Sequence, residues 1–310
     1  MPPNQIASYA AHALKSAPFA YLAPLRLADA LDHLAELGED ARVLAGGQSL
    51  IPLLALRLAR PGVLVDLGRI ASLAEVQERE GWLVLGSMTR ELQAERSALV
   101  ARGWPLLGAA LRFIGHSAIR SRGTVGGSLA HADPAAELPA VALALQAELV
   151  AQSKGRGERT IAALDFFLGP YTTALASDEI LTEIRIPSSS GGFSFQEVAR
   201  RHGDFALVGV AATVELERGR IKGCRVALTG VSDRPVPGSG TELGMVGEEP
   251  TPKLFRAVAQ QLAAVVRPPS DLHGTAGYRR QLVSVLVPRA LEEASARAGV
   301  GPIDGGGLSP

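Results

Sequence analysis

The sequence is poor in cysteine and has no excess of charge of either sign. Cys224 is the only cysteine among 310 residues, which excludes a disulfide framework, a four-cysteine zinc site and an iron–sulfur cluster held by this chain alone. Lysine and arginine together number 31, as do aspartate and glutamate, so the formal net charge is zero. Nucleic acids and anionic membranes favour partners with a basic surplus. The sequence therefore predicts neither as a main partner.

Long hydrophobic runs are missing too. No apolar stretch approaches the ~20 residues that a membrane-spanning helix needs, so we do not expect an integral membrane protein. Residues 1–25 contain several alanines but lack the basic start of a secretory signal, and His12 and Lys15 interrupt the apolar residues. We therefore expect the protein to lie in the cytoplasm.

The usual sequence signatures of catalysis and metal binding are also missing. The six histidines are scattered, and there is no Gly-x-Gly-x-x-Gly after a strand, no phosphate loop, no His-Glu-x-x-His and no Gly-x-Ser-x-Gly. Cys224 falls in a predicted strand, where a buried structural thiol is the expected role. We therefore predict no catalytic side chain and no metal ligand in this chain.

Glycine, in contrast, is abundant and gathers in two similar turns between predicted regular elements. The first turn comprises Ala45, Gly46, Gly47, Gln48, Ser49 and Leu50, and the second comprises Thr124, Val125, Gly126, Gly127 and Ser128. Each offers consecutive backbone N–H groups beside a hydroxyl. Two such turns facing one another would cradle a diphosphate without a positive side chain, because oriented N–H groups supply the field. Taken singly, each is more often a plain structural turn.

The order of the predicted elements indicates an α+β fold. Strands and helices alternate up to about residue 187, and Pro187-Ser188-Ser189-Ser190-Gly191-Gly192 then forms a linker without an apolar residue. Beyond it we expect strands over 193–199, 207–216 and 221–231 and helices over 252–266 and 276–298, which together make an antiparallel sheet with helices. Residues 1–16 are expected to be a flexible lead-in and residues 299–310 a flexible tail.

Several segments taken in order resemble the FAD-binding medium subunit of the molybdenum hydroxylases. This family includes the carbon monoxide dehydrogenase medium chains and the FAD domain of xanthine dehydrogenase. The matching segments are the first turn with Ile51 and Pro52, then residues 119–128, 133–139, 179–187 and 200–206. They stand in the family's order with family-like spacing, so the resemblance covers about residues 17–295.

The resemblance implies a two-lobed FAD-binding domain of the PCMH/vanillyl-alcohol-oxidase type, with lobes at about 17–70 and 71–187, followed by a smaller α+β domain at 193–298. It implies that both turns hold the diphosphate of a non-covalent FAD. By the same resemblance Glu137 bonds the cofactor, Leu181 packs near the flavin and Phe205 lies beside the isoalloxazine. Ser128 stands where asparagine is usual, Phe205 replaces a tyrosine of the carbon monoxide enzyme, and Gln196 falls where xanthine dehydrogenase has lysine.

The resemblance also implies an oxidoreductase subunit that transfers electrons. It would accept electrons from a small [2Fe-2S] subunit and pass them to an external acceptor, beside a large molybdopterin subunit in an (αβγ)2 complex. Iron–sulfur clusters and molybdopterin are expected only on those partners. The alternative is a self-contained FAD-dependent oxidoreductase, which needs a substrate pocket with an acid or base beside the flavin. Neither turn holds the histidine or cysteine to which covalent flavins attach. A scaffold that has lost FAD is a third alternative, and the intact glycines of both turns argue against it.

Overall fold

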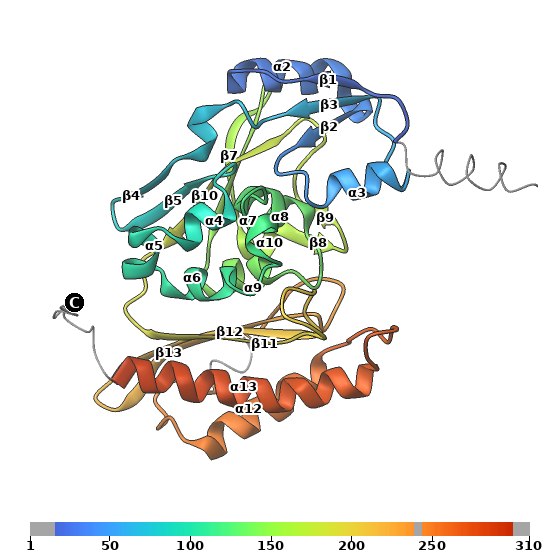
Figure 1. The fold of residues 1–310 in the computed structure, drawn as a ribbon. Coiled ribbons are helices and arrows are strands. Elements are labelled where there is room, and N and C mark those ends of the chain that lie inside the picture. Colours follow the sequence, from blue (N-terminus) through green and yellow to red (C-terminus); the bar gives the residue numbers. More distant parts are fainter. Residues whose placement is uncertain (1–15, 239–243, 300–310) are drawn as a thin grey trace, which may run out of the picture.

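The computed structural model describes residues 16–238 and 244–299. The expected lead-in at 1–16 and tail at 299–310 fall almost wholly outside these residues, except for Ser16 and for Gly299, which is the last residue of a long helix. The chain forms three stacked parts (Figure 1), namely a small N-terminal lobe, a larger second lobe and a C-terminal sheet backed by two helices.

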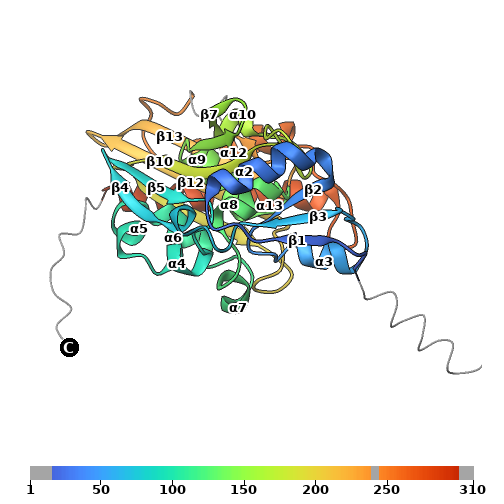
Figure 2. The ribbon, with the colours of Figure 1, turned by 90° about the horizontal axis from the view of Figure 1, so that it is seen from above.

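The N-terminal lobe is a parallel sheet with a helix on each face. Its strands are β1 (Ala20–Leu22), β3 (Val63–Asp66) and β2 (Ala41–Leu44), in that spatial order. Successive side chains of a strand point to opposite faces. Val65 therefore packs against α2 (Leu27–Leu37), while Leu64 packs against Leu54 of α3 (Leu50–Ala55). Figure 2 shows α2 and α3 on opposite sides of this sheet.

The second lobe is built on a five-stranded antiparallel sheet. The strand order is β4 (Val76–Arg79), β5 (Trp82–Gly86), β10 (Ile180–Pro187), β6 (Glu148–Ser153) and β7 (Gly157–Ala162). Short helices cover it, and a two-stranded ribbon adjoins them. These elements are α4 (Glu91–Glu95), α5 (Ala98–Gly103), α6 (Pro105–Leu111), α7 (Ser117–Arg120), α8 (Val125–His131), α9 (Glu137–Ala144), α10 (Ala163–Phe166), β8 (Phe167–Gly169) and β9 (Thr172–Thr173). The largest hydrophobic core lies between the sheet and the helices.

The C-terminal part is an antiparallel sheet, as the sequence predicts. Its strands, in spatial order, are β11 (Gly192–Val198), β12 (Val208–Glu217), β13 (Arg220–Thr229) and β14 (Val236–Pro237). Val208, Val210 and Val214 alternate along β12 and face the helices α12 (Pro252–Val265) and α13 (Ala276–Gly299). Ala211 faces the second lobe, so this sheet buries both of its faces.

The predicted linker is shorter in the structure than in the sequence pattern. Pro187 ends β10 and Gly192 begins β11, which leaves residues 188–191 as the connection. A Cβ at Gly192 would lie 1.9 Å from the carbonyl oxygen of Ala294 in α13. Glycine is therefore needed there because strand and helix backbones approach closely, and not because the chain bends freely.

Candidate cofactor site

The structure brings the two glycine turns together. The first turn connects β2 to α3, whereas residues 125–128 of the second turn already belong to α8, which Thr124 caps. A Cβ at Gly46 would lie 2.2 Å from the carbonyl oxygen of Arg122, and a Cβ at Gly127 would lie 3.3 Å from Cβ of Ala45. The first turn therefore packs against residues 122–123 and against Gly127 of the second turn, and only glycine fits at Gly46.

The first turn presents a row of N–H groups without a protein acceptor. Among the described residues, no hydrogen bond forms from the backbone N–H groups of residues 46–50, whereas the next one, on Ile51, donates to Gly47 O over 3.0 Å. Gly47 has a φ of +77°, a conformation that glycine adopts without steric cost. A run of consecutive backbone N–H groups without protein acceptors is a candidate site for an anion.

The second turn differs from the expectation, because its N–H groups are already used. Gly126 donates to Ser87 O over 2.9 Å and Val125 donates to Thr89 O over 3.0 Å. Gly127 donates to Thr124 Oγ1 over 3.0 Å, and Thr124 itself is buried. A Cβ at Gly126 would lie 2.5 Å from Cβ of Ser87, so this glycine serves packing within the chain.

A cavity of about 80 Å³ lies between the two lobes, beside both turns. Its walls are mostly apolar and come from Val43, Ala45, Leu67, Ser87, Met88, Gly126, Gly127, Ala130, Leu175, Glu179, Ile180 and Leu181. Ser87 is 4% exposed, and its Oγ has no hydrogen-bond partner in the part of the chain that is described. Drug-sized ligands occupy roughly 300–1,000 Å³, so this cavity has room for one portion of a dinucleotide.

The remaining predicted site residues lie at different distances from the turns. Leu181 is buried and lines the cavity. Glu137 is the first residue of α9, is 4% exposed and does not line the cavity. Phe205 lies on the connection between β11 and β12, outside the cavity, with 63% of its surface exposed. The structure therefore groups Leu181 with the turns and leaves Phe205 apart.

The sequence reading missed a group of buried carboxyls around Glu137. Burial raises the pKa of Glu91 and of Glu197 to about 8 each and that of Glu137 to about 7. Glu137 raises the pKa of the other two further by its charge, and Arg120 opposes the shift at Glu91. Across residues 16–238 and 244–299, Glu91 Oε2 and Glu197 Oε2 find no hydrogen-bond partner. These two acids are therefore mostly neutral at pH 7.

Glu91 contacts Gly123, the residue before the second turn, through both its backbone N–H and its side chain. Glu91 N–H donates to Gly123 O over 3.0 Å, and a Cβ at Gly123 would lie 2.3 Å from Glu91 Oε2. Glu197 could have been found from the sequence, because it shares its strand face with Phe193 and Phe195. The described residues contain no group of three or more His, Cys, Asp or Glu placed to hold a metal ion.

Sequence comparison places this site in a known family. Residues 17–189 match the family described as "FAD binding domain in molybdopterin dehydrogenase", and residues 193–294 match "CO dehydrogenase flavoprotein C-terminal domain". The chain is 42% identical to the nicotine 6-hydroxylase medium subunit of Paenarthrobacter nicotinovorans, over 89% of this chain and 97% of that protein. The chain belongs to the FAD-binding medium subunits of the molybdenum hydroxylases.

Solved structures agree with this assignment. Carbon monoxide dehydrogenase from Hydrogenophaga pseudoflava is 36% identical, with a TM-score of 0.89 over 91% of this chain and 99% of that chain. Quinoline 2-oxidoreductase from Pseudomonas putida 86 is 37% identical, with a TM-score of 0.88 over 92% and 99%. The resemblance and the fold predicted from sequence are therefore confirmed. This medium subunit is part of an oxidoreductase and its cofactor is FAD, so the self-contained alternative is not favoured.

The residues present fit FAD. A diphosphate needs several oriented donors, and the first turn provides unoccupied N–H groups with the hydroxyl of Ser49 beside them. An aromatic ring needs apolar walls, and the neighbouring cavity provides them. No helix in the described ranges is both long and apolar enough to cross a bilayer.

Cys224 lies in β13 and is 7% exposed, within the core formed by the C-terminal sheet and its helices. A Cys224→Ser substitution is expected to leave FAD content and the rate of flavin reduction nearly unchanged. The buried hydroxyl should lower the free energy of unfolding by about 1–3 kcal/mol. Stopped-flow reduction and denaturant unfolding of both proteins check this. Loss of flavin reduction with FAD content preserved would contradict the structural role of the thiol.

Proposed function

We propose that this medium subunit relays electrons from a small [2Fe-2S] subunit to an external acceptor, while hydroxylation takes place on a large molybdopterin subunit. The observation that carries the proposal is the row of unoccupied N–H groups at residues 46–50, beside a cavity with no candidate general base among its walls except the ion-paired Glu179. FAD when bound supplies the capacity to accept and release electrons. This chain supplies its placement.

We propose the following roles for the site residues. The N–H groups of residues 46–50 hold the diphosphate, and the hydroxyls of Thr124 and Ser128 add donors from the second turn. Val125, Gly126 and Gly127 contribute by the close packing of that turn. Leu181 forms an apolar wall. Glu137 forms a hydrogen bond with the cofactor, and Phe205 lies beside the isoalloxazine once the cofactor is bound.

The domain division, the assembly and the location are also proposals. The two matched segments, 17–189 and 193–294, support boundaries near residues 187 and 193. We propose an (αβγ)2 complex in the cytoplasm, for which cell fractionation and the mass of the complex in solution are the tests. Appearance of the tagged chain in the periplasmic fraction would contradict the location.

Copurification tests the proposed function. A tagged chain, expressed together with its small and large subunits, is expected to bring down iron and molybdenum with about one FAD per tagged chain. Reduction by the substrate of the complex should then reach the flavin only when the iron–sulfur subunit is present. A flavin-containing chain that carries neither metal and oxidises a substrate alone would support the self-contained alternative instead.

A further inference from the structure

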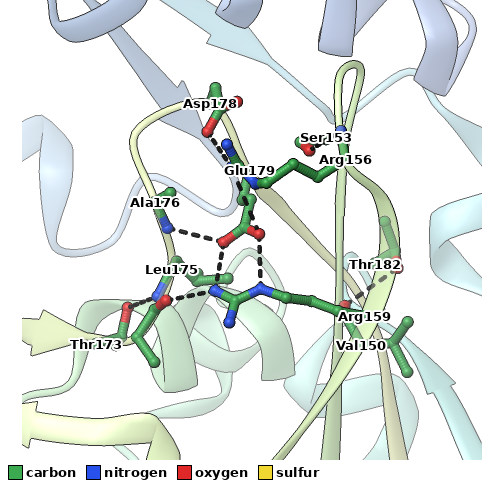
Figure 3. A network of polar contacts seen from close by, with 11 residues as sticks. Val150, Ser153, Arg156, Arg159, Thr173, Leu175, Ala176, Asp178, Glu179 and Thr182 are labelled. Carbon is green, nitrogen blue, oxygen red and sulfur yellow. Dashed lines mark hydrogen bonds and ion pairs between the residues drawn. The ribbon is translucent and has the colours of Figure 1, made fainter.

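One charged residue, Glu179, lines the cavity, and its carboxylate is held by an ion pair with an arginine whose side chain is exposed (Figure 3). Glu179 directly precedes β10, its side chain is 1% exposed, and it lies beside Ile180 and Leu181 in the cavity wall. A charge at such a depth requires a partner, since an unpaired buried carboxylate is strongly destabilising.

The partner of Glu179 is Arg159 of β7. Arg159 Nε donates to Glu179 Oε1 and Arg159 Nη2 donates to Glu179 Oε2, both over 2.7 Å. The backbone N–H of Ala176 donates to Glu179 Oε2 over 2.8 Å. The Arg159 hydrogen bonds hold the pKa of Glu179 below its usual range, so the carboxylate is charged. Two parallel hydrogen bonds of this kind fix geometry as well as adding energy.

Arg159 also fixes the other end of the same wall segment. Its Nη2 donates to the carbonyl oxygen of Ala174 over 2.6 Å. Residues 174–179 form no helix or strand, yet they contribute Leu175 and Glu179 to the cavity. Arg159 therefore forms hydrogen bonds with both ends of the irregular segment 174–179, which makes up part of one side of the cavity.

The charges of this ion pair also bear on the binding of an anionic ligand. Without Arg159, the buried carboxylate of Glu179, which belongs to a residue of the cavity wall, would keep only Arg156, at 3.6 Å, as a cation. Arg156 is engaged with Asp178 on the outer side of the loop. An uncompensated carboxylate would repel a diphosphate-bearing cofactor, whereas an amide at position 179 would not.

We propose that Arg159 is a positioning residue for FAD. By pairing with Glu179, it holds residues 174–181 in place as a cavity wall and neutralises the charge of the Glu179 carboxylate. Arg159 thereby determines how tightly the protein retains the cofactor. This inference rests on the proposed function, because it takes the cavity to be part of the FAD site. Arg159 and Glu179 then join the two glycine turns and Leu181 in the FAD site.

The experiment measures the Kd and the release rate of FAD from the fluorescence of free flavin, in the assembled complex. Arg159→Gln is expected to weaken FAD binding about 10- to 100-fold, and Glu179→Gln only a few-fold. The double variant should bind FAD more tightly than Arg159→Gln, because it has no unpaired carboxylate, and less tightly than Glu179→Gln, because it has lost the bond from Arg159 to Ala174. A double variant as weak as Arg159→Gln would show a scaffolding role alone and would overturn the neutralising role.

The control is Arg185→Gln. Arg185 lies in β10 and pairs with Glu158 of β7 at 3.4 Å, so it joins the same two parts of the sheet region without lining the cavity. The Kd of the Arg185→Gln protein for FAD should stay within about two-fold of the wild-type value. Equal affinities of wild type and Arg159→Gln, with thermal unfolding of both preserved, would overturn the inference. Failure of the wild type itself to bind FAD would instead reject the proposed function.

Discussion

A Gly47→Val protein is expected to fold and to bind FAD at least about a hundred-fold more weakly than wild type, which corresponds to about 2.7 kcal/mol. Gly47 has a φ of +77°, where a Cβ costs roughly 1–2 kcal/mol and a β-branched side chain more. A Cβ there would also lie 3.0 Å from Cγ1 of Ile51. Relief of this strain should rotate the turn and move the N–H groups of residues 47–49 away from the ligand.

Gly219→Val is the matched control for this prediction. Gly219 has a φ of +76° in the hairpin between β12 and β13, and a Cβ there would meet nothing within 4 Å. The Gly219→Val protein should lose about as much unfolding free energy as the Gly47→Val protein. Its Kd for FAD, measured by equilibrium titration of the apoprotein, should not change. Retention of wild-type affinity in Gly47→Val would contradict the assignment of the first turn as the cradle.

A Glu91→Gln protein is expected to be more stable than wild type at alkaline pH, by up to about 4 kcal/mol at pH 8–9. Burial, followed by the charge of Glu137, raises the pKa of Glu91 from 4.5 to about 8, against the opposing charge of Arg120. The folded state therefore holds a proton that the unfolded state releases above pH 4.5. The stability contributed by this proton is complete below pH 4.5 and is lost as pH rises towards and through 8.

Urea unfolding of the apoprotein between pH 6 and 9 checks the direction in which the free energy of unfolding changes with pH. The wild-type free energy of unfolding should fall with rising pH, and the fall should be shallower in Glu91→Gln, with Glu137 and Glu197 accounting for the remainder. Glu78, whose side chain is 45% exposed, provides a control, and Glu78→Gln should reproduce the wild-type profile. An unchanged slope in Glu91→Gln would contradict burial of its carboxyl in the neutral form.

Local periodicity was sufficient to predict much of the C-terminal part. The strands predicted at 207–216 and 221–231 are β12 and β13, and the helices predicted at 252–266 and 276–298 are α12 and α13, because each buries an apolar face that repeats along its own segment. The glycine turns were recognised for a similar reason, since their composition is local. The antiparallel pairing of β12 and β13 follows from a short turn between them.

Features that depend on distant residues were not predicted. The N–H group of Gly126 is used by Ser87, which lies far earlier in the chain, so the sequence could not show that this donor is occupied. Arg159 and Glu179 come together only because β7 and the loop before β10 are neighbours in the folded lobe. Glu197 meets Glu137 only because the C-terminal sheet packs on α9.

The flavin content of the purified chain tests the central claim most directly. We would record the absorbance spectrum of the purified protein and then compare the heat-released flavin with FAD and FMN standards. About one FAD per chain, with no iron on the isolated chain, is the predicted result. A colourless chain that also fails to take up added FAD would contradict the assignment of the turns at residues 45–50 and 124–128 as a cofactor cradle.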